Sequence, residues 1–339
     1  MTSIRILYPD VKSVDDFAFE RAVVPDGVDL IHYDATDVSA IPDDVWRDAD
    51  AMVTGIRMPI DDAVFDRATS CRIITRLGVG YDMIDTVAAA RRGIRVCNVP
   101  DYGTTEVADH AIALLLSLLR GVVRYDQAFR ADKEEGWSFR HAPVVKRLGE
   151  VKLGVVGIGR IGTAAALRAK AFGMSVSFYD PYAPGGTELA LGVERFDSLE
   201  ALLANCDAIT VHTPLTDETH HLIDAKAVAA MQPGLVLINT ARGGVVDLDA
   251  VHEGLKQSQI GAVGLDVFET EPPEPDHPLI KAWRAREDWI DGRCVITPHA
   301  AFYSPTSLRV MREKAVMTCV DYLTSGLLKN CINKNLLTN

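Results

Sequence analysis

Three polar side chains in the second half of the chain each follow an apolar, strand-like run, where a polar residue is unfavourable unless it has a function. These residues are Arg242, Glu271 and His299. In open α/β sheets, ligands bind at the carboxyl ends of the strands. If the three runs form parallel strands of one sheet, we expect the arginine, the carboxylate and the histidine to converge on one cleft.

This set of side chains suits the interconversion of a hydroxyl and a carbonyl group by hydride transfer. The reaction needs a group that moves the hydroxyl proton, and His299 is of the residue type that titrates near neutral pH. Glu271 would orient the imidazole and stabilise its protonated form. Arg242 would bind a substrate carboxylate and polarise the carbonyl. Each residue alone also fits an ordinary structural or surface role, but their joint placement favours catalysis.

A glycine-rich turn, Gly157-Ile158-Gly159-Arg160-Ile161-Gly162, separates an apolar strand-like run from a segment that suits a helix, residues 163–172. Gly157 permits a tight turn, Gly159 lets the backbone approach a pyrophosphate, and Gly162 allows close packing of helix on strand. The free N–H groups and the dipole at the helix N-terminus attract the phosphates. Such a pattern alone also occurs in ordinary loops, but in this context it predicts a dinucleotide site.

The acidic partner of this turn is Asp180, which ends the next strand-like run about 20 residues further on. Its carboxylate would accept hydrogen bonds from the hydroxyls of the adenosine ribose. Pro181 and Tyr182 follow it, and no arginine stands there to accommodate a 2′-phosphate. The sequence therefore predicts NAD rather than NADP as the cofactor.

The elements that must position these residues alternate between strands and helices in two separate runs along the chain. This pattern favours parallel sheets with helices on both faces. A helix or two joined helices are expected over 104–130, linking the two runs, and a terminal helix over 307–328. The expected strands cover residues 4–8, 51–54, 72–75, 94–96, 152–156, 175–179, 208–211, 235–238, 262–265 and 294–296.

Composition limits the class of protein. The length of 339 residues favours two domains, and the formal net charge of −12 disfavours nucleic acid as a partner. No apolar run is long enough to cross a membrane and no signal peptide is evident, so a cytoplasmic protein is expected. The six cysteines lack metal-ligand spacing. No metal is therefore expected, and the remaining histidines, which lack evident partners, include His212, His220, His221 and His277.

The order and identity of these motifs resemble the D-isomer-specific 2-hydroxyacid dehydrogenase family over nearly the whole chain. By this resemblance, Arg242, Glu271 and His299 would form the catalytic triad. The end of the chain and the segment 298–304 look most like the C-terminal-binding-protein branch, although Phe302 stands where that branch carries tryptophan. The segments that carry the family resemblance are 76–82, 153–162, 212–215, 239–244, 265–273 and 297–299.

The resemblance also implies an architecture and further contacts. It predicts two Rossmann-like or flavodoxin-like domains with cofactor and substrate in the cleft between them, and a homodimer. A discontinuous substrate domain would cover 1–101 and 304–339, and an NAD-binding domain 102–303. Substrate contacts would come from Arg76, Val79, Gly80 and Phe302. The cofactor contacts expected beyond the glycine turn and Asp180 are Val107, His212, Thr213, Pro214, Thr240, Ala241 and Asp266.

The predicted function is an NAD-dependent oxidoreductase that interconverts a small 2-keto acid and a D-2-hydroxy acid. One alternative is an NAD(H)-sensing, corepressor-like binding protein in which domain closure exposes a partner surface. Another is a phosphite or formate dehydrogenase. Formate dehydrogenases resemble this fold but carry glutamine at the position of Glu271, whereas phosphite oxidation uses a similar triad.

Overall fold

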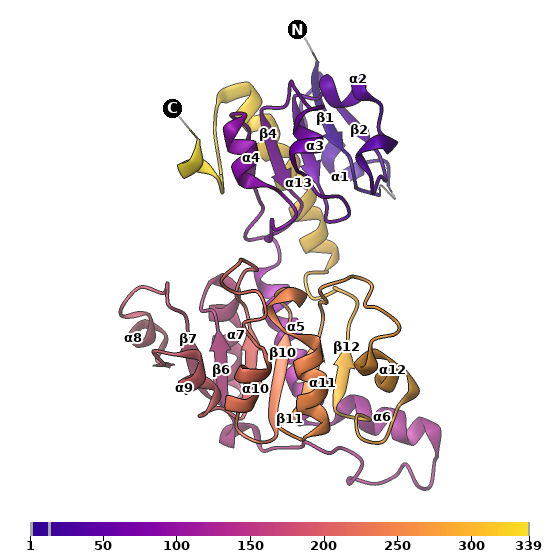
Figure 1. Cartoon of the computed structure of the whole chain (residues 1–339), viewed down its shortest axis with the longest axis vertical. Coiled ribbons are helices and arrows are strands. Elements are labelled where there is room, and N and C mark those ends of the chain that lie inside the picture. The colour runs from indigo at the N-terminus through magenta and orange to yellow at the C-terminus, as the bar shows by residue number, and fades with distance from the viewer. Residues whose placement is uncertain (1–2, 13–14, 338–339) are drawn as a thin grey trace. The chain divides into compact units, whose positions relative to one another are not determined.

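The computed structural model describes residues 3–12 and 15–337, which form two compact units (Figure 1). The first unit comprises Met1–Gly103 and Ser304–Asn339, and the second Thr104–Tyr303. The chain thus enters the second unit two residues later than the expected boundary at 101/102, at the start of a helix, and leaves it between 303 and 304.

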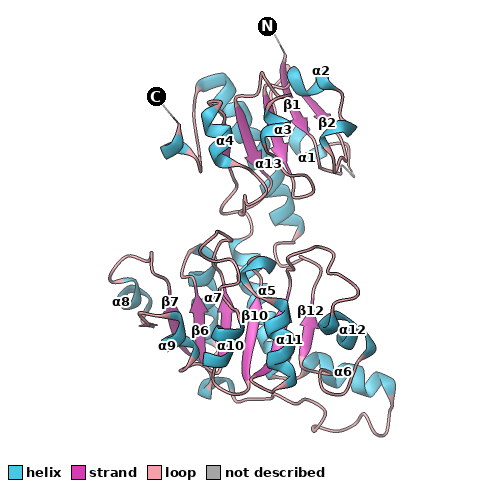
Figure 2. Ribbon diagram, viewed as in Figure 1, coloured by secondary structure: helices cyan, strands magenta, loops and turns pink. Residues whose placement is uncertain are grey.

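The first unit is built on a five-stranded parallel sheet of order β2-β1-β3-β4-β5 (Figure 2). Alternate side chains of one strand enter two different cores, since Met52 packs on one face and Val53 on the other. Such burial on both faces is typical of parallel sheets. The strands are β1 (Ile4–Tyr8), β2 (Val28–His32), β3 (Ala51–Thr54), β4 (Ile73–Arg76) and β5 (Arg95–Cys97).

Helices cover both faces of this sheet. The long terminal helix α13 (Pro305–Ser325) packs against β1, β3 and β4, so the end of the chain returns to the first unit as expected. Ser304 caps its N-terminus by accepting a hydrogen bond from the Ser307 N–H, and Gly326 ends it in the left-handed conformation. The shorter helices are α1 (Ala18–Arg21), α2 (Asp43–Arg47), α3 (Asp62–Phe65) and α4 (Thr86–Arg91).

The second unit contains a seven-stranded parallel sheet of order β12-β11-β10-β9-β6-β7-β8. Successive strands run outward in both directions from β6, which makes the edge between β6 and β9 the topological switch point of a doubly wound sheet. The strands are β6 (Lys152–Val156), β7 (Ser175–Tyr179), β8 (Glu194–Arg195), β9 (Ala208–Val211), β10 (Leu235–Asn239), β11 (Ile260–Leu265) and β12 (Cys294–Ile296).

Two hydrophobic cores sandwich this sheet between helices. One contains α5 (Thr104–Leu119) and α7 (Arg160–Ala171), and the other contains α9 (Leu199–Leu203), α10 (Ala225–Ala230), α11 (Leu248–Lys256) and α12 (Pro278–Ala285). The apolar residues of α5 are buried in the core of its own unit. They therefore give no separate argument for the expected homodimer. The remaining helices are α6 (Val122–Ala131) and α8 (Thr187–Leu191).

The strands expected from the sequence are all present, within two residues at each end. The expected helical stretch 104–130 is two helices, because Gly121 in the left-handed conformation separates α5 from α6. Two edge strands were missed, β2 and β8. In β2 the apolar residues are interrupted by Asp29, and β8 consists of Glu194 and Arg195 alone, so neither has a continuous apolar run. No helix in the described part of the chain is long and apolar enough to span a membrane.

Candidate active site

The glycine-rich turn joins β6 to α7 at the switch point of the second sheet. Gly157 has φ +90°, and a Cβ there would lie 2.9 Å from the carbonyl oxygen of His212. A Cβ on Gly162 would lie 2.0 Å from the carbonyl oxygen of Gly157. By contrast, a Cβ on Gly159 would have no atom of the described residues within 4 Å. The turn is therefore tightly packed behind Gly157 and Gly162 and open in front of Gly159, as a site for a pyrophosphate requires.

Arg160 and Ile161 begin α7 directly after this open position. The first N–H groups of a helix have no intrahelical acceptor, and the helix dipole adds positive potential there. Gly159 provides no side-chain cap for these groups. Backbone donors and empty space thus coincide where the cofactor's phosphates are expected.

Asp180 follows β7 and lies beside this turn. Its Oδ2 accepts a hydrogen bond of 2.9 Å from the N–H of Ile158, and its Oδ1 accepts one of 2.9 Å from the N–H of Tyr182. The carboxylate therefore stabilises the glycine-rich turn, a role that the sequence did not predict. A carboxylate oxygen offers a second lone pair, so both oxygens retain acceptor capacity for ribose hydroxyls.

His212 follows β9, on the other side of the switch point. Its Nε2 lies 2.9 Å from the hydroxyl of Thr210. Burial lowers the pKa of His212 to about 4, so the ring is neutral at neutral pH. Thr213 and Pro214 continue the chain past the glycine turn, and the N–H of Thr213 would lie 3.1 Å from a Cβ on Gly157.

Thr240 and Ala241 follow β10 on the same carboxyl edge of the sheet. The buried hydroxyl of Thr240 has no hydrogen-bond partner within the described chain. An unsatisfied buried hydroxyl is unfavourable, and a polar group of a bound cofactor would satisfy it. Asn239 shapes this segment by accepting from the N–H of Ala241 at 3.0 Å and donating to the carbonyl of Arg242 at 2.9 Å. Asn239 was not singled out in the sequence, although Asn at a strand end is a common turn signal.

Glu271 and His299 are joined by a hydrogen bond of 2.6 Å between Oε2 and Nδ1. The other oxygen of Glu271 accepts from the N–H of Phe268 at 2.9 Å. Burial raises the pKa of Glu271, but the hydrogen bonds from His299 and Phe268 and the positive charge of Arg242 outweigh it, so the net pKa is below the usual range. The carboxylate is therefore ionised beside the imidazole, within electrostatic reach of Arg242.

Asp266 organises the loop that carries His299. Its side chain is fully buried. Oδ1 accepts from the Thr297 hydroxyl at 2.5 Å and the Ala300 N–H at 2.9 Å, while Oδ2 accepts from the Ala301 N–H at 2.9 Å. These contacts hold His299 in the left-handed conformation, with φ 51°. Asp266 was expected to contact the cofactor, whereas its side-chain hydrogen bonds are with this loop.

His110 extends this network from α5, a contact that the sequence did not predict. Its Nε2 lies 3.0 Å from the hydroxyl of Thr297. His110 and Thr297 are 187 residues apart, and no spacing in the sequence connects them. Only the packing of α5 against the sheet brings them together.

Comparison with known proteins places this geometry in a family. The sequence profile of the D-isomer-specific 2-hydroxyacid dehydrogenase NAD-binding domain matches residues 112–301. The glyoxylate reductase of Korarchaeum cryptofilum is 38% identical over 294 residues, which are 86% of this chain and 85% of that protein. The chain belongs to the D-isomer-specific 2-hydroxyacid dehydrogenase family. It is accordingly an oxidoreductase with NAD as its cofactor.

Further relatives agree with this assignment. The D-3-phosphoglycerate dehydrogenase of Methanocaldococcus jannaschii is 39% identical over 234 residues, 69% of this chain and 44% of that protein. The NADPH-dependent glyoxylate/hydroxypyruvate reductase of Sinorhizobium meliloti, solved with NADP and malonate, has a TM-score of 0.86 at 30% identity, covering 100% of this chain and 99% of that one. These relatives are dehydrogenases and reductases, so the resemblance to the C-terminal-binding-protein branch stays a prediction.

Two further expected contacts of this dehydrogenase lie in the second unit. The ring of Phe302 stands edge-on to the ring of His299, with centroids 6.2 Å apart and planes at 83°. Phe302 is thus a neighbour of the candidate acid/base. Val107 lies in α5 and is 9% exposed, so only a small part of its side chain is available to a ligand.

The expected substrate contacts of the first unit lie in the bend after β4. Arg76 is buried, and its Nη1 donates to the carbonyl of Leu77 at 2.5 Å. Gly78, with φ +137°, makes room for that side chain, since a Cβ there would lie 1.5 Å from Nη1. Nδ2 of Asn98 donates a hydrogen bond of 2.6 Å to the carbonyl oxygen of Val79, the residue before Gly80. The bend is therefore ordered by its own contacts, and its role in substrate binding stays a prediction.

The glycine-rich turn allows a prediction that separates binding from folding. Gly159→Ala should fold normally, because φ at Gly159 is −64° and its Cβ meets nothing, but should weaken NADH binding by tenfold or more, as the methyl group occupies the pyrophosphate space. Gly162→Ala should instead lower the melting temperature, because its Cβ would collide with the Gly157 carbonyl. Fluorescence titration with NADH and thermal unfolding measure the two effects. Equal NADH affinity in Gly159→Ala and wild type would contradict this site.

His212 should make the stability of the second unit depend on pH. Its folded pKa of about 4 lies below the unfolded value near 6.5, so protons bind preferentially to the unfolded chain. Stability present above pH 6.5 is therefore lost as the pH falls toward 4. His212→Asn should reduce the difference in urea midpoint between pH 7 and pH 5, relative to wild type. His141→Asn, which removes a partly exposed histidine of the same unit, should leave that difference unchanged.

Proposed function

We propose that this dehydrogenase interconverts a small 2-keto acid and the D-2-hydroxy acid, with His299 as the general acid and base. The observation that carries this proposal is the 2.6 Å bond between Nδ1 of His299 and Oε2 of Glu271, at the carboxyl edge that also carries the glycine-rich turn. A histidine whose Nδ1 is held by a carboxylate keeps Nε2 available for a substrate oxygen.

The proton transfer rests on the Glu271–His299 pair. In reduction, His299 delivers a proton from Nε2 to the carbonyl oxygen, and in oxidation it removes the proton from the hydroxyl. The negative charge of Glu271 stabilises the imidazolium and fixes its orientation. When NADH is bound, it supplies the hydride that reduces the carbonyl carbon.

Arg242 takes the role of anion binding in this proposal. Its backbone is fixed by Asn239, and its Nη1 donates to the Ala241 carbonyl at 2.8 Å. A guanidinium presents five N–H donors in a planar fork, a geometry that suits bidentate binding of a substrate carboxylate. A positive charge there binds the substrate and stabilises negative charge that develops on the carbonyl oxygen.

Asp180 supports a preference for NADH over NADPH. Its Oδ2 accepts from the N–H of Ile158 in the glycine-rich turn, and its Oδ1 accepts from the N–H of Tyr182, two residues further along its own segment. A 2′-phosphate on the ribose would approach this carboxylate and be repelled, whereas a free 2′-hydroxyl would donate a hydrogen bond to it.

A substrate screen tests the proposed function directly. Oxidation of NADH and NADPH would be followed with glyoxylate, hydroxypyruvate, pyruvate, phenylpyruvate and longer 2-keto acids. We expect turnover with at least one small keto acid, a D-configured product where the product is chiral, and a higher kcat/KM with NADH. The names of the relatives make glyoxylate and hydroxypyruvate the first acids to test. Absence of turnover with every acid would contradict the proposal.

A further inference from the structure

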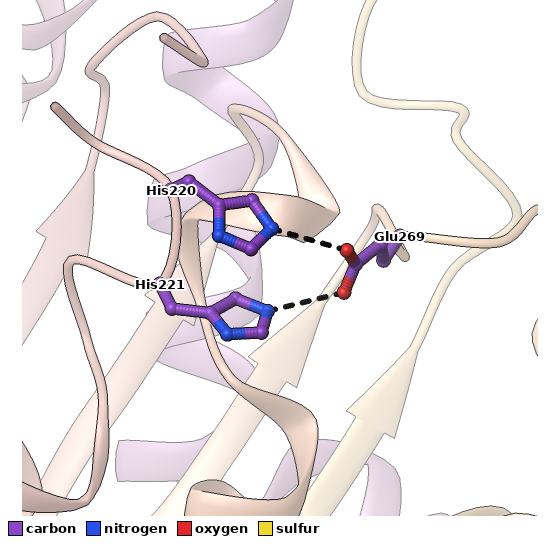
Figure 3. Close-up of side chains that lie close together, drawn as sticks. All are labelled: His220, His221 and Glu269. Atoms are coloured by element: carbon purple, nitrogen blue, oxygen red, sulfur yellow. Dashed lines mark hydrogen bonds and ion pairs between the residues drawn. The ribbon is translucent and has the colours of Figure 1, made fainter. Parts of the chain in front are cut away.

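Two adjacent histidines and a glutamate meet in the second unit, outside the residues assigned to the reaction (Figure 3). His220 and His221 lie between β9 and α10, and Glu269 follows β11. Nε2 of His220 is 3.2 Å from Oε1 of Glu269, and Nε2 of His221 is 3.1 Å from Oε2. The three potential ligand atoms lie within 4.8 Å of one another. No sequence motif indicated this cluster, because Glu269 is 49 residues from His220.

The backbone turns both imidazoles to the same side. His221 adopts the left-handed conformation, with φ 48°, which is unfavourable for a residue other than glycine. Its N–H donates to the carbonyl of Gly244 at 2.8 Å, which anchors the loop. The two rings stack with centroids 4.0 Å apart and planes at 22°, and both face the carboxylate in Figure 3. The three side chains are thus arranged around one point before any ligand arrives.

We propose that His220, His221 and Glu269 bind a divalent transition-metal ion, of the class of Zn²⁺ and Co²⁺. Ligand atoms around a tetrahedral ion with bonds of about 2.0 to 2.2 Å are separated by about 3.3 to 3.6 Å. The observed separations of 3.2 and 3.1 Å lie a few tenths of an ångström below that range, so a small outward rotation of the side chains admits the ion. Two imidazole nitrogens with one carboxylate oxygen select Zn²⁺ or Co²⁺ over Mg²⁺ and Ca²⁺, which prefer oxygen ligands alone. Water completes the coordination, since His220 and Glu269 are exposed.

The surroundings of the cluster favour a cation. A cavity of about 250 Å³ borders His221 and Glu269 and is also lined by Asp247, Asp249 and Glu274. These carboxylates place negative potential beside the three ligands. A bound metal ion is held by the neutral form of both rings.

The test measures metal binding itself and does not depend on the proposed reaction. Tag-free, metal-stripped protein would be titrated with Co²⁺, and the visible absorption of the bound ion followed, with Zn²⁺ as competitor. We expect saturation at one ion per chain and displacement by Zn²⁺. Activity is a poor readout here, because Glu269 lies two residues from Glu271.

Variants locate the ion. His221→Asn and Glu269→Gln should each weaken Co²⁺ binding by tenfold or more. His277→Asn is the matched control, because it removes a histidine from the same cavity while asparagine still caps α12, and its affinity should equal that of wild type. His299→Asn should also bind normally, which excludes the Glu271–His299 pair as the site.

Three results would overturn the proposal. They are the absence of saturable binding by wild type, unchanged affinity in both His221→Asn and Glu269→Gln, or loss of binding in His299→Asn. Circular dichroism of each variant shows whether the second unit is folded. If His221→Asn is unfolded, the Co²⁺ affinity of Glu269→Gln alone decides whether the cluster is the metal site. The side chain of Glu269 is exposed, so this substitution leaves the backbone of the loop unchanged.

Discussion

Replacing His299 by asparagine should lower kcat by about 10²- to 10⁴-fold, the range typical of a lost general acid and base. Asparagine is the informative substitution because it tolerates the left-handed conformation that His299 adopts, with φ 51°. The loop can then keep its shape while the titratable ring is removed. NADH affinity should remain close to that of wild type, since the glycine-rich turn follows a different strand of the sheet.

Steady-state kinetics with the best substrate of the screen, together with fluorescence titration of NADH, measure this effect. Glu271→Gln is the companion variant, because glutamine preserves the reach of the side chain and removes the charge. Its kcat should fall less than that of His299→Asn, since the ring is retained but its protonated form loses the stabilising carboxylate. A His299→Asn enzyme with more than a tenth of wild-type turnover would remove His299 from the mechanism.

The parts of this architecture that depend on local sequence were predictable. Apolar runs such as 152–156 and 208–211 produce strands because buried parallel strands need continuous apolar residues. Gly157 and Gly162 indicated the turn because no side chain fits at those positions. The edge strand β8, with only Glu194 and Arg195, carries no such signal.

The sequence predicted only those residues of the candidate site that directly follow strands. Glu271 and His299 both follow strands of one sheet, so their proximity could be inferred before the 2.6 Å bond was seen. The remaining contacts depend on how the loops fold, and the spacing of residues along the sequence does not predict loop geometry. His110 reaches Thr297 from helix α5. Glu269 contacts His220 and His221, two histidines for which the sequence showed no partner.

Asp266→Asn should destabilise the second unit by roughly 2 to 4 kcal/mol and lower turnover as well. Asparagine keeps one acceptor oxygen where the aspartate uses two. If that oxygen replaces Oδ1, the amide group faces the N–H of Ala301, and if it replaces Oδ2, the amide faces the N–H of Ala300. Either orientation sets donor against donor at a fully buried position, so one N–H loses its partner.

The same loop carries His299, whose N–H donates to the backbone carbonyl of Asp266 at 2.8 Å. Asp266→Asn should therefore lower kcat by displacing the imidazole, and this loss should appear below the melting temperature of the variant, where the protein is folded. Asp224→Asn is the matched control, because that aspartate accepts one N–H as the N-cap of α10, where asparagine is equally favourable. The urea midpoint and the kcat of Asp224→Asn should both be near the wild-type values. The NADH affinity of Asp266→Asn then separates two roles for Asp266. If Asp266 only positions the His299 loop, kcat falls while NADH affinity stays at the wild-type value. If Asp266 contacts the cofactor, NADH binding weakens as well.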